Sequence, residues 1–378
     1  MSFELTEEQE TLRRTVRKFA ENELAPIAAD ADEKGEFHRE IYEKLADIGL
    51  LGIPCPEEYG GAGLDYSTYA VVIEEIAKYC LATAVGLAVQ GLPQIMIGLF
   101  GSDEQKGTYL APLAAGEKLG AFALTEPGAG SDAAALKTTA MLDGDSYVLN
   151  GTKAFITHGG VADIYLVMAK TEPEKGSRGI SSFVVEDGAP GFSFGKIEKK
   201  MGMRASPTRE IIFEDCRIPR ENLVGREGDG FKIAMIALDS GRITIGAAAV
   251  GVAQAALDES IQYAKQREQF GQPIANFQGI QFMLADMATS IRAARNLVRE
   301  AAFLKDEGKP FSHIAAMAKL FATDTAMKVT TDAVQIFGGY GYMQDYPVER
   351  LMRAAKVTQI VEGTNQIQRM VVARHLLK

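Results

Sequence analysis

Apolar residues recur at helical spacing through the first 115 or so residues of the chain. Thr6-Glu7-Glu8-Gln9 has the pattern of a capping box, and apolar residues then follow every third or fourth position until Pro26. This pattern predicts a first amphipathic helix that begins near Thr6. Similar spacing predicts three further helices, over residues 41–48, 67–89 and 103–115.

The spacing becomes strand-like between about residues 120 and 222. Asp143-Gly144 and Asn150-Gly151 are strong hairpin signals, and residues 147–149 between them form a predicted short strand. Further strands are predicted over 163–170, 179–186, 192–198 and 210–213. Many short strands without helices between them favour a small antiparallel barrel or sandwich.

Helical spacing returns after Gly230, in long runs over 231–267, 276–306, 311–337 and 361–377. Long helices with short connections predict an antiparallel bundle. We therefore expect an α+β protein of three domains. They are an N-terminal α-helical domain (1–119), a middle antiparallel β-barrel domain (120–228) and a C-terminal four-helix bundle (229–378).

Length and composition narrow the class of protein. The 378 residues exceed the usual size of one core, which favours several domains, and 47% hydrophobic with 24% charged residues is typical of a soluble globular protein. By our interpretation no apolar run approaches the roughly 20 residues that cross a bilayer, so we expect no membrane span. The acidic N-terminus lacks the features of a signal or transit peptide, and we expect a cytoplasmic protein.

Cysteine, histidine and charge argue against several kinds of site. Three widely spaced cysteines favour a reducing compartment over a disulfide framework, and four histidines without ligand spacing predict no metal site. A net charge of −10 disfavours a nucleic-acid-binding surface, although a local basic pocket for a small polyanion is compatible with it.

Three distant motifs carry the candidate chemistry: LTEPGAGSD at 124–132, REQFG at 267–271 and IVEGTNQIQR at 360–369. Gly128-x-Gly130-x-x-Ala133 formally matches the dinucleotide fingerprint. Hairpin signals follow it where that fingerprint needs a helix, so the Rossmann interpretation fails. A turn of small residues with hydroxyls and backbone N–H groups can nevertheless approach a planar heterocycle and a phosphate closely.

Each candidate also has an ordinary structural explanation. Residues 154–157 fit an apolar strand that feeds a core, and Arg242 fits a solvated or ion-paired residue in a long helix. Arg267 with Gly271 fits a helix C-terminus, and Glu362 fits a cap of the last helix. The residues alone leave these alternatives open.

Taken together, the motifs and their order over the whole chain resemble the acyl-CoA dehydrogenases, flavoenzymes that desaturate acyl thioesters. The resemblance implies FAD as the cofactor, an acyl-CoA substrate and an electron-transfer flavoprotein as the electron acceptor. It also implies a homotetramer, a dimer of dimers, with each FAD at a subunit interface. The Gly241-Arg242 pair resembles short-chain and short-branched-chain members, and butyryl to hexanoyl chains are the favoured substrates.

The resemblance also assigns roles to individual residues. Glu362 would be the base that removes the α-proton while the β-hydrogen leaves as hydride to flavin N5. Gly241 stands where some members carry this base, and glycine cannot act as one. The positions implied to contact FAD are Thr125, Gly130, Ser131, Phe155, Thr157, Arg267, Phe270, Gln335, Gly339, Thr364 and Gln366, and those implied to contact the substrate are Ser131, Asp239, Arg242 and Gly363.

Three further expectations concern the base, the subunits and the thioester carbonyl. Ile360 and Val361 precede Glu362, and such an apolar setting would raise the pKa of the carboxyl toward neutrality. The segments around Arg267 and Gln335 are implied to reach the flavin of the neighbouring subunit. The backbone N–H of Glu362 and the flavin's ribityl 2′-hydroxyl are implied to polarise the thioester carbonyl as enolate charge develops.

Two alternatives remain for the activity. One is an oxidase of the same fold that O₂ reoxidises, which is disfavoured because the known acyl-CoA oxidases carry an additional C-terminal domain. The other is a scaffold that binds flavin or acyl-CoA without catalysis, which is disfavoured by the intact Glu362 beside intact flavin motifs.

Overall fold

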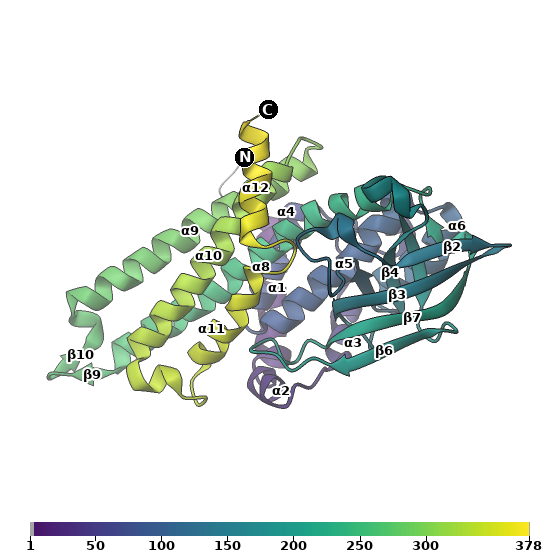
Figure 1. Ribbon diagram of the computed structural model, residues 1–378. Helices are drawn as coiled ribbons and strands as arrows, with labels where there is room; N and C mark the ends of the chain where they lie inside the picture. Colours follow the sequence, from purple (N-terminus) through teal and green to yellow (C-terminus); the bar gives the residue numbers. More distant parts are fainter. Residues whose placement is uncertain (1–3, 378) are drawn as a thin grey trace.

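A computed structural model describes residues 4–377 of the chain (Figure 1). Its N-terminal part is helical, as predicted, and α1 begins at the predicted capping box, in which Gln9 N donates to Thr6 Oγ1 at 3.1 Å. The predicted helix over 67–89 is two helices, because the backbone at Cys80 is extended and the second helix continues to Phe100. The helices are α1 (Glu7–Phe19), α2 (Ala28–Lys34), α3 (Arg39–Asp47), α4 (Tyr66–Ala77), α5 (Leu81–Phe100), α6 (Asp103–Gln105) and α7 (Ala111–Ala115).

The middle part is a sheet, but the closed antiparallel barrel that we expected is wrong. Its strands follow the order β6-β7-β3-β2-β4-β5-β8, an open path whose two ends do not pair. It is also mixed, because β1 pairs with β4 in parallel. The strands are β1 (Gly120–Ala123), β2 (Thr139–Asp143), β3 (Ser146–Thr157), β4 (Ile164–Lys170), β5 (Ile180–Glu186), β6 (Phe192–Ile197), β7 (Thr208–Pro219) and β8 (Leu223–Val224).

The two predicted hairpin signals have different outcomes. Asp143-Gly144 is the β2–β3 turn, in which Asp143 pairs with Ser146 and Gly144 has a φ of 64°. Asn150-Gly151 is no turn, because β3 runs through it with a register shift against β7. A Cβ on Gly151 would lie 2.7 Å from the Thr138 Cα, so this glycine permits a close approach within a bulged strand.

The C-terminal part holds five helices, one more than predicted. They are α8 (Gly230–Gln266), α9 (Gln278–Asp306), α10 (Ser312–Phe337), α11 (Pro347–Thr358) and α12 (Asn365–Leu376), with a short hairpin of β9 (Glu268–Gln269) and β10 (Gln272–Pro273) between α8 and α9. The unpredicted α11 begins with Pro347, whose fixed φ suits a first helical turn, and buries Val348 and Leu351.

Two helices are long and apolar enough to cross a bilayer, α5 and α8, which corrects our statement that no apolar run approaches that length. Within the structure, 72% of the apolar window of α5 and 78% of that of α8 are buried. Core packing therefore accounts for their composition. At Gly251 of α8, a Cβ would lie 2.2 Å from the Glu74 carbonyl oxygen, so α4 and α8 cross in close contact.

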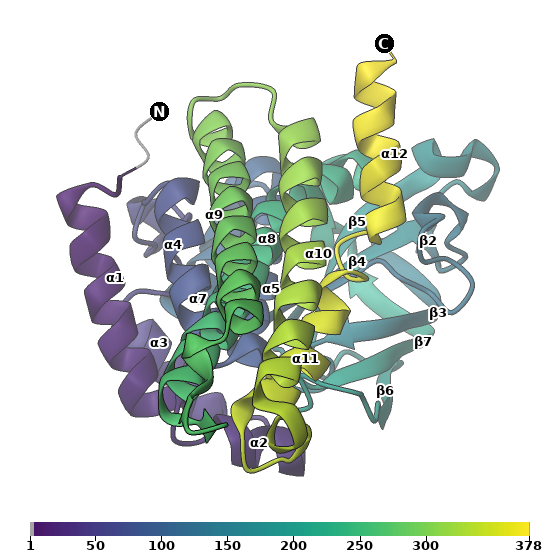
Figure 2. The same cartoon turned by 90° about the vertical axis from the view of Figure 1, so that its left-hand side faces the viewer.

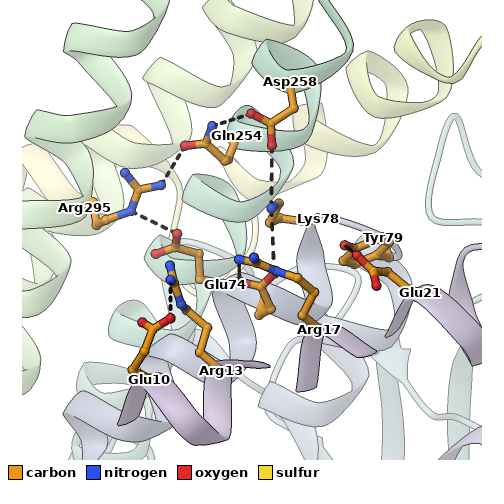
Figure 3. Close-up of polar contacts among 11 residues, drawn as sticks. Glu10, Arg13, Arg17, Glu21, Glu74, Lys78, Tyr79, Gln254, Asp258 and Arg295 are labelled. Atoms are coloured by element: carbon orange, nitrogen blue, oxygen red, sulfur yellow. Dashed lines mark hydrogen bonds and ion pairs between the residues drawn. The ribbon is translucent and has the colours of Figure 1, made fainter. Parts of the chain in front are cut away.

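Ion pairs join the N-terminal helices to the C-terminal bundle (Figure 3). Arg17 on α1 contacts Glu75 on α4 through two nitrogens, at 2.7 and 3.3 Å. Neighbouring Glu74 accepts from Arg295 on α9 at 2.9 Å. Figure 2 shows α1 and α4 on one side of the α8–α10 group and the sheet on the other. The Glu74–Arg295 pair thus attaches the N-terminal helices to the bundle.

Candidate active site

Glu362 lies in the loop between α11 and α12. Figures 1 and 2 show this loop on the side of the bundle that faces the sheet. Both Glu362 and Gly363 have left-handed backbones, with φ values of 55° and 87°. The residue that caps α12 is Thr364, whose hydroxyl accepts from Ile367 N at 3.3 Å. The interpretation of Glu362 as a helix cap is therefore wrong, and its carboxylate is free for another role.

The Glu362 carboxylate lies directly against α8. A Cβ added to Gly241 would be 2.6 Å from Glu362 Oε2, so any other residue at 241 would collide with the carboxylate. Oε2 is buried and, among the described residues, has no hydrogen-bond partner. Burial raises the pKa of Glu362 to about 7, against the opposing charges of Arg242 and Lys319. A carboxyl group with this pKa can accept a proton near neutral pH.

Asp239 and Arg242, the predicted substrate contacts, form an ion pair one turn apart on α8. The Arg242 side chain is 7% exposed, and its Nε is a buried donor without a partner in the described part of the chain. An unsatisfied buried guanidinium N–H is costly to leave without an acceptor. Arg242 and Glu362 therefore present one unpaired donor and one unpaired acceptor among the described residues, and the charge of Arg242 lowers the pKa of Glu362.

A buried ion pair supports the turn at 125–131. Lys153 on β3 is fully buried, and its Nζ lies 2.8 Å from Glu126 Oε1 and 3.2 Å from the Leu124 carbonyl. The Glu126 carboxylate also accepts from Lys137 N at 2.6 Å and from Thr138 N at 2.9 Å. Although burial raises it, the pKa of Glu126 is lowered overall by Lys153 and these donors, so the carboxylate is ionised.

The turn at 125–131 lies against the strand that contains Phe155. Ala154 N donates to the Thr125 carbonyl at 2.8 Å. Ala154 and Ile156 are buried, as expected for an apolar strand, whereas Phe155 is 68% exposed with a φ of 58°. A left-handed backbone at an aromatic residue costs on the order of 1–3 kcal/mol, and such strain persists where the surroundings impose it. Phe155 therefore offers an exposed aromatic face next to the Thr125 turn.

Two glycines of this turn are not explained by the fold. Neither Gly128 nor Gly130 has a positive φ, and a Cβ on either would meet no atom within 4 Å. Open space on that side allows a bound group to approach the backbone closely. Ser131, which follows Gly130, is exposed, and Thr157 at the end of β3 is half-buried.

Four other predicted residues form a second group at the far end of the bundle: Arg267, Phe270, Gln335 and Gly339. Arg267 directly follows α8, and its guanidinium lies 5.4 Å from the ring centroid of Tyr340. The interpretation of Gly271 as the helix cap is wrong, because α8 ends at Gln266 and Gly271 belongs to the β9–β10 turn. Phe270 in this turn is 93% exposed, and Figure 1 shows the turn projecting away from the sheet.

Comparison with known proteins gives a consistent result. Sequence models of the N-terminal, middle and C-terminal domains of acyl-CoA dehydrogenases match residues 6–117, 121–216 and 228–377. The chain belongs to the acyl-CoA dehydrogenase family. It is 52% identical to a short-chain specific acyl-CoA dehydrogenase from Clostridium acetobutylicum, over 100% of both chains.

Two solved structures share the fold of this family member over the full length of both chains. One is butyryl-CoA dehydrogenase from Megasphaera elsdenii, with a TM-score of 0.98 and 50% identity. The other is a chain from a study of the electron transferring flavoprotein of Acidaminococcus fermentans, with a TM-score of 0.99 and 55% identity. The order of helical, sheet and helical domains predicted from the sequence is thereby confirmed.

In this acyl-CoA dehydrogenase, the loop that carries Glu362 and the group around Arg267 lie in different parts of the same chain. Gln335 is exposed at the end of α10, and Gly339 follows in a short helical turn, where a Cβ would meet no atom within 4 Å. The roles of Arg267, Phe270, Gln335 and Gly339 toward a neighbouring subunit's flavin stay predictions. The same holds for Thr364 and for Gln366, which is exposed in the first turn of α12.

Three supporting residues were missed from the sequence: Glu126, Lys153 and Lys319. Lys153 directly precedes the apolar positions 154–156 of β3, and Lys319 lies in an apolar, alanine-rich part of α10. A lone lysine on an apolar face was the available signal, because lysine is almost never fully buried unless it is paired.

Proposed function

We propose that this protein catalyses the FAD-dependent α,β-dehydrogenation of a short-chain acyl-CoA to the trans-2-enoyl-CoA. The single observation that carries the proposal is the Glu362 carboxylate: its Oε2 is buried, has no hydrogen-bond partner among the described residues, and occupies the space that Gly241 leaves open. FAD, when bound, supplies the N5 atom that accepts the β-hydrogen as hydride. An electron-transfer flavoprotein then takes the electrons.

The chain's own residues account for the proton-transfer half of the reaction. Glu362 takes the α-proton, and the two electrons of that C–H bond form the new α,β-double bond as hydride leaves the β-carbon. Its backbone N–H donates to no acceptor among the described residues, so it is available to the thioester carbonyl. Such a donor stabilises the enolate charge that develops as the proton leaves.

The residues near Phe155 fit a planar cofactor. Phe155 supplies an exposed aromatic face, and Gly128 and Gly130 leave the backbone open to close approach. The hydroxyl groups of Thr125, Ser131 and Thr157 lie on the segments that border this face. These features support FAD as the group that is held there.

The short-chain preference and the assembly are also part of the proposal. The relatives named for short-chain acyl groups and butyryl-CoA are 52% and 50% identical over the whole chain, which supports a short straight acyl group. An exposed Phe270 at the tip of the bundle supports a homotetramer in which this tip completes a neighbour's flavin site. We further propose domain boundaries at 1–119, 120–228 and 229–378 and a cytoplasmic location.

An anaerobic visible spectrum of the purified protein, recorded before and after addition of butyryl-CoA, tests the function. We expect the oxidised-flavin band to bleach and a long-wavelength charge-transfer band to appear. A flavin that no acyl-CoA bleaches would contradict the dehydrogenase and favour the scaffold. Rapid reoxidation by O₂ after bleaching would favour the oxidase alternative.

A further inference from the structure

A buried lysine lies beneath the loop that carries Glu362. Lys319, from the middle of α10, is fully buried. Its Nζ donates to the Gly363 carbonyl at 3.0 Å and to Asn365 Oδ1 at 2.9 Å. Both acceptors lie within three residues of Glu362, so the lysine is bound to the turn that sets the direction of the carboxylate.

The same turn is held from α12. Gln368 Nε2 donates to the Glu362 carbonyl at 3.1 Å and to the Gly363 carbonyl at 2.8 Å. The Gly363 carbonyl therefore receives hydrogen bonds from both Gln368 and Lys319. A left-handed residue followed by a left-handed glycine persists only where its surroundings impose it, and these donors do so here.

The charge of Lys319 is not neutralised by a direct partner. Both of its acceptors are neutral oxygens, and no carboxylate of the described residues forms an ion pair with it. The charged groups that face it are Glu362 on the loop, Asp324 on its own helix and Arg242 on α8. Asp324 contacts Arg369 at 3.2 Å, and Arg242 is paired with Asp239. Glu362 is thus the facing carboxylate without an ion-pair partner.

We propose that Lys319 is a positioning residue for the base: it fixes the Glu362–Gly363 turn through the Gly363 carbonyl, and its buried charge favours the ionised form of the Glu362 carboxylate. This inference rests on the proposed function, in which Glu362 is the base. An apolar site favours the protonated carboxyl, and a protonated lysine nearby opposes that preference. Lys319 thereby limits how far burial raises the pKa of the base.

Three variants separate the two parts of this role. K319M removes both the charge and the donor, whereas K319Q removes the charge and retains a donor for the Gly363 carbonyl. K328M is the matched control, because Lys328 is an exposed lysine of the same helix whose partner is Asp332. Hydrogen exchange of the peptide 358–368 reports on the turn, and the pH profile of kcat/KM with butyryl-CoA reports on the base.

For K319M we expect exchange in this peptide to rise about tenfold, because the turn opens more often. We also expect the acidic limb of its kcat/KM profile to move upward by about one pH unit, since the favourable charge is lost. K319Q should move the acidic limb of the kcat/KM profile upward with little change in the hydrogen exchange of the peptide. K328M should change neither measurement. FAD content, measured by absorbance, should be the same in all three.

The proposal is overturned if K319M matches K328M in both exchange and acidic limb. If K319M does not fold, K319Q decides: an unmoved acidic limb in that variant overturns the charge role, and a limb moved upward supports it. A wild-type protein that turns over no acyl-CoA would instead contradict the proposed function, and the exchange measurement would still test how Lys319 holds the turn.

Discussion

Lys153 and Lys319 are both fully buried, and each supports one half of the candidate site, but they are neutralised differently. Lys153 contacts the Glu126 carboxylate at 2.8 Å, so its charge is cancelled within the turn at 125–131, which we propose to border the flavin. Lys319 contacts two neutral oxygens. Burial lowers the pKa of Lys153 to about 8 and that of Lys319 to about 7, and facing carboxylates oppose the change in both.

The difference follows from what each half of the site must do. A turn that only borders a cofactor needs a fixed backbone. The Glu126–Lys153 ion pair fixes this backbone, and because its two charges cancel, it has little electrostatic effect on other groups. A base needs its proton affinity set, and Lys319, when protonated, lowers the pKa of the Glu362 carboxyl that it faces. Substitutions at Glu362 should therefore lower turnover, whereas substitutions at Lys153 should lower stability and FAD binding.

The largest effect is expected on the base side, from Glu362→Gln. Glutamine retains the shape of the side chain but cannot accept the α-proton, so turnover should fall by at least ~10²-fold. FAD content should stay at the wild-type level, because Glu362 is not part of the Glu126–Lys153 support. Steady-state turnover with an artificial acceptor measures the loss, and near-normal turnover would contradict the assignment of the base.

On the flavin side, Lys153→Met leaves Glu126 as an unpaired buried carboxylate. Breaking a buried pair in this way costs about 3–5 kcal/mol of unfolding free energy. We expect a correspondingly lower midpoint in urea and loss of FAD on gel filtration. The double variant Glu126→Gln with Lys153→Met is the matched control, and it should recover much of the stability. Equal stability of the single and double variants would show that the charge is not the cause.

The pH dependence of stability distinguishes the base from its surroundings. The folded-state pKa of Glu362, about 7, lies above its ordinary value of 4.5. The native state therefore binds more protons than the unfolded state between those values, and stability falls as pH rises through that range. Glu362→Gln carries no such charge. Its midpoint in urea should match the wild type near pH 4.5 and exceed it near pH 8, and a constant difference would contradict the shift.

A smaller effect is expected from Gly241→Ala. The added Cβ would lie 2.6 Å from Glu362 Oε2, so the carboxylate must move by a few tenths of an ångström or more. Misplacing a catalytic group by about 1 Å can cost 10²-fold, and we expect kcat to fall about tenfold. Gly246→Ala on the same helix, where a Cβ would meet Val298 instead, is the control for helix packing.

The motif residues could be identified from the sequence, whereas the contacts that support them could not. Glu362 could be predicted because its segment, IVEGTNQIQR at 360–369, resembles that of the acyl-CoA dehydrogenases, whereas the residues alone left a helix cap open. Lys319 and Asn365 lie 46 residues apart in the chain, and Lys153 and Glu126 lie 27 apart, so only the folded structure brings these partners together. The location of Glu362 against Gly241 likewise depends on how α8 packs.

The errors in the fold have related causes. Counting strands cannot decide whether a sheet closes, since closure depends on how the end strands pair, and here β6 and β8 remain unpaired with each other. Asn150-Gly151 has the composition of a turn, but its glycine is required by the approach of Thr138 from a neighbouring segment. Helix α11 was missed because its apolar residues occupy only a short stretch between glycine-rich and polar segments.

The smallest effect on the isolated chain, and the sharpest test of the second residue group, comes from Phe270→Ala. Because this side chain is 93% exposed, its removal should change the unfolding free energy of the FAD-free chain by no more than about 0.5 kcal/mol. If the tip of the bundle completes a neighbour's flavin site, the same change should nevertheless increase FAD loss on dilution, and Arg267→Ala should do so more strongly because its guanidinium can bind phosphate oxygens. Flavin occupancy after serial dilution measures the loss of FAD. The control is Phe282→Ala, because Phe282 is an exposed aromatic residue on α9, outside the β9–β10 turn. Unchanged occupancy in Arg267→Ala would contradict the role of its guanidinium in binding the phosphates of FAD.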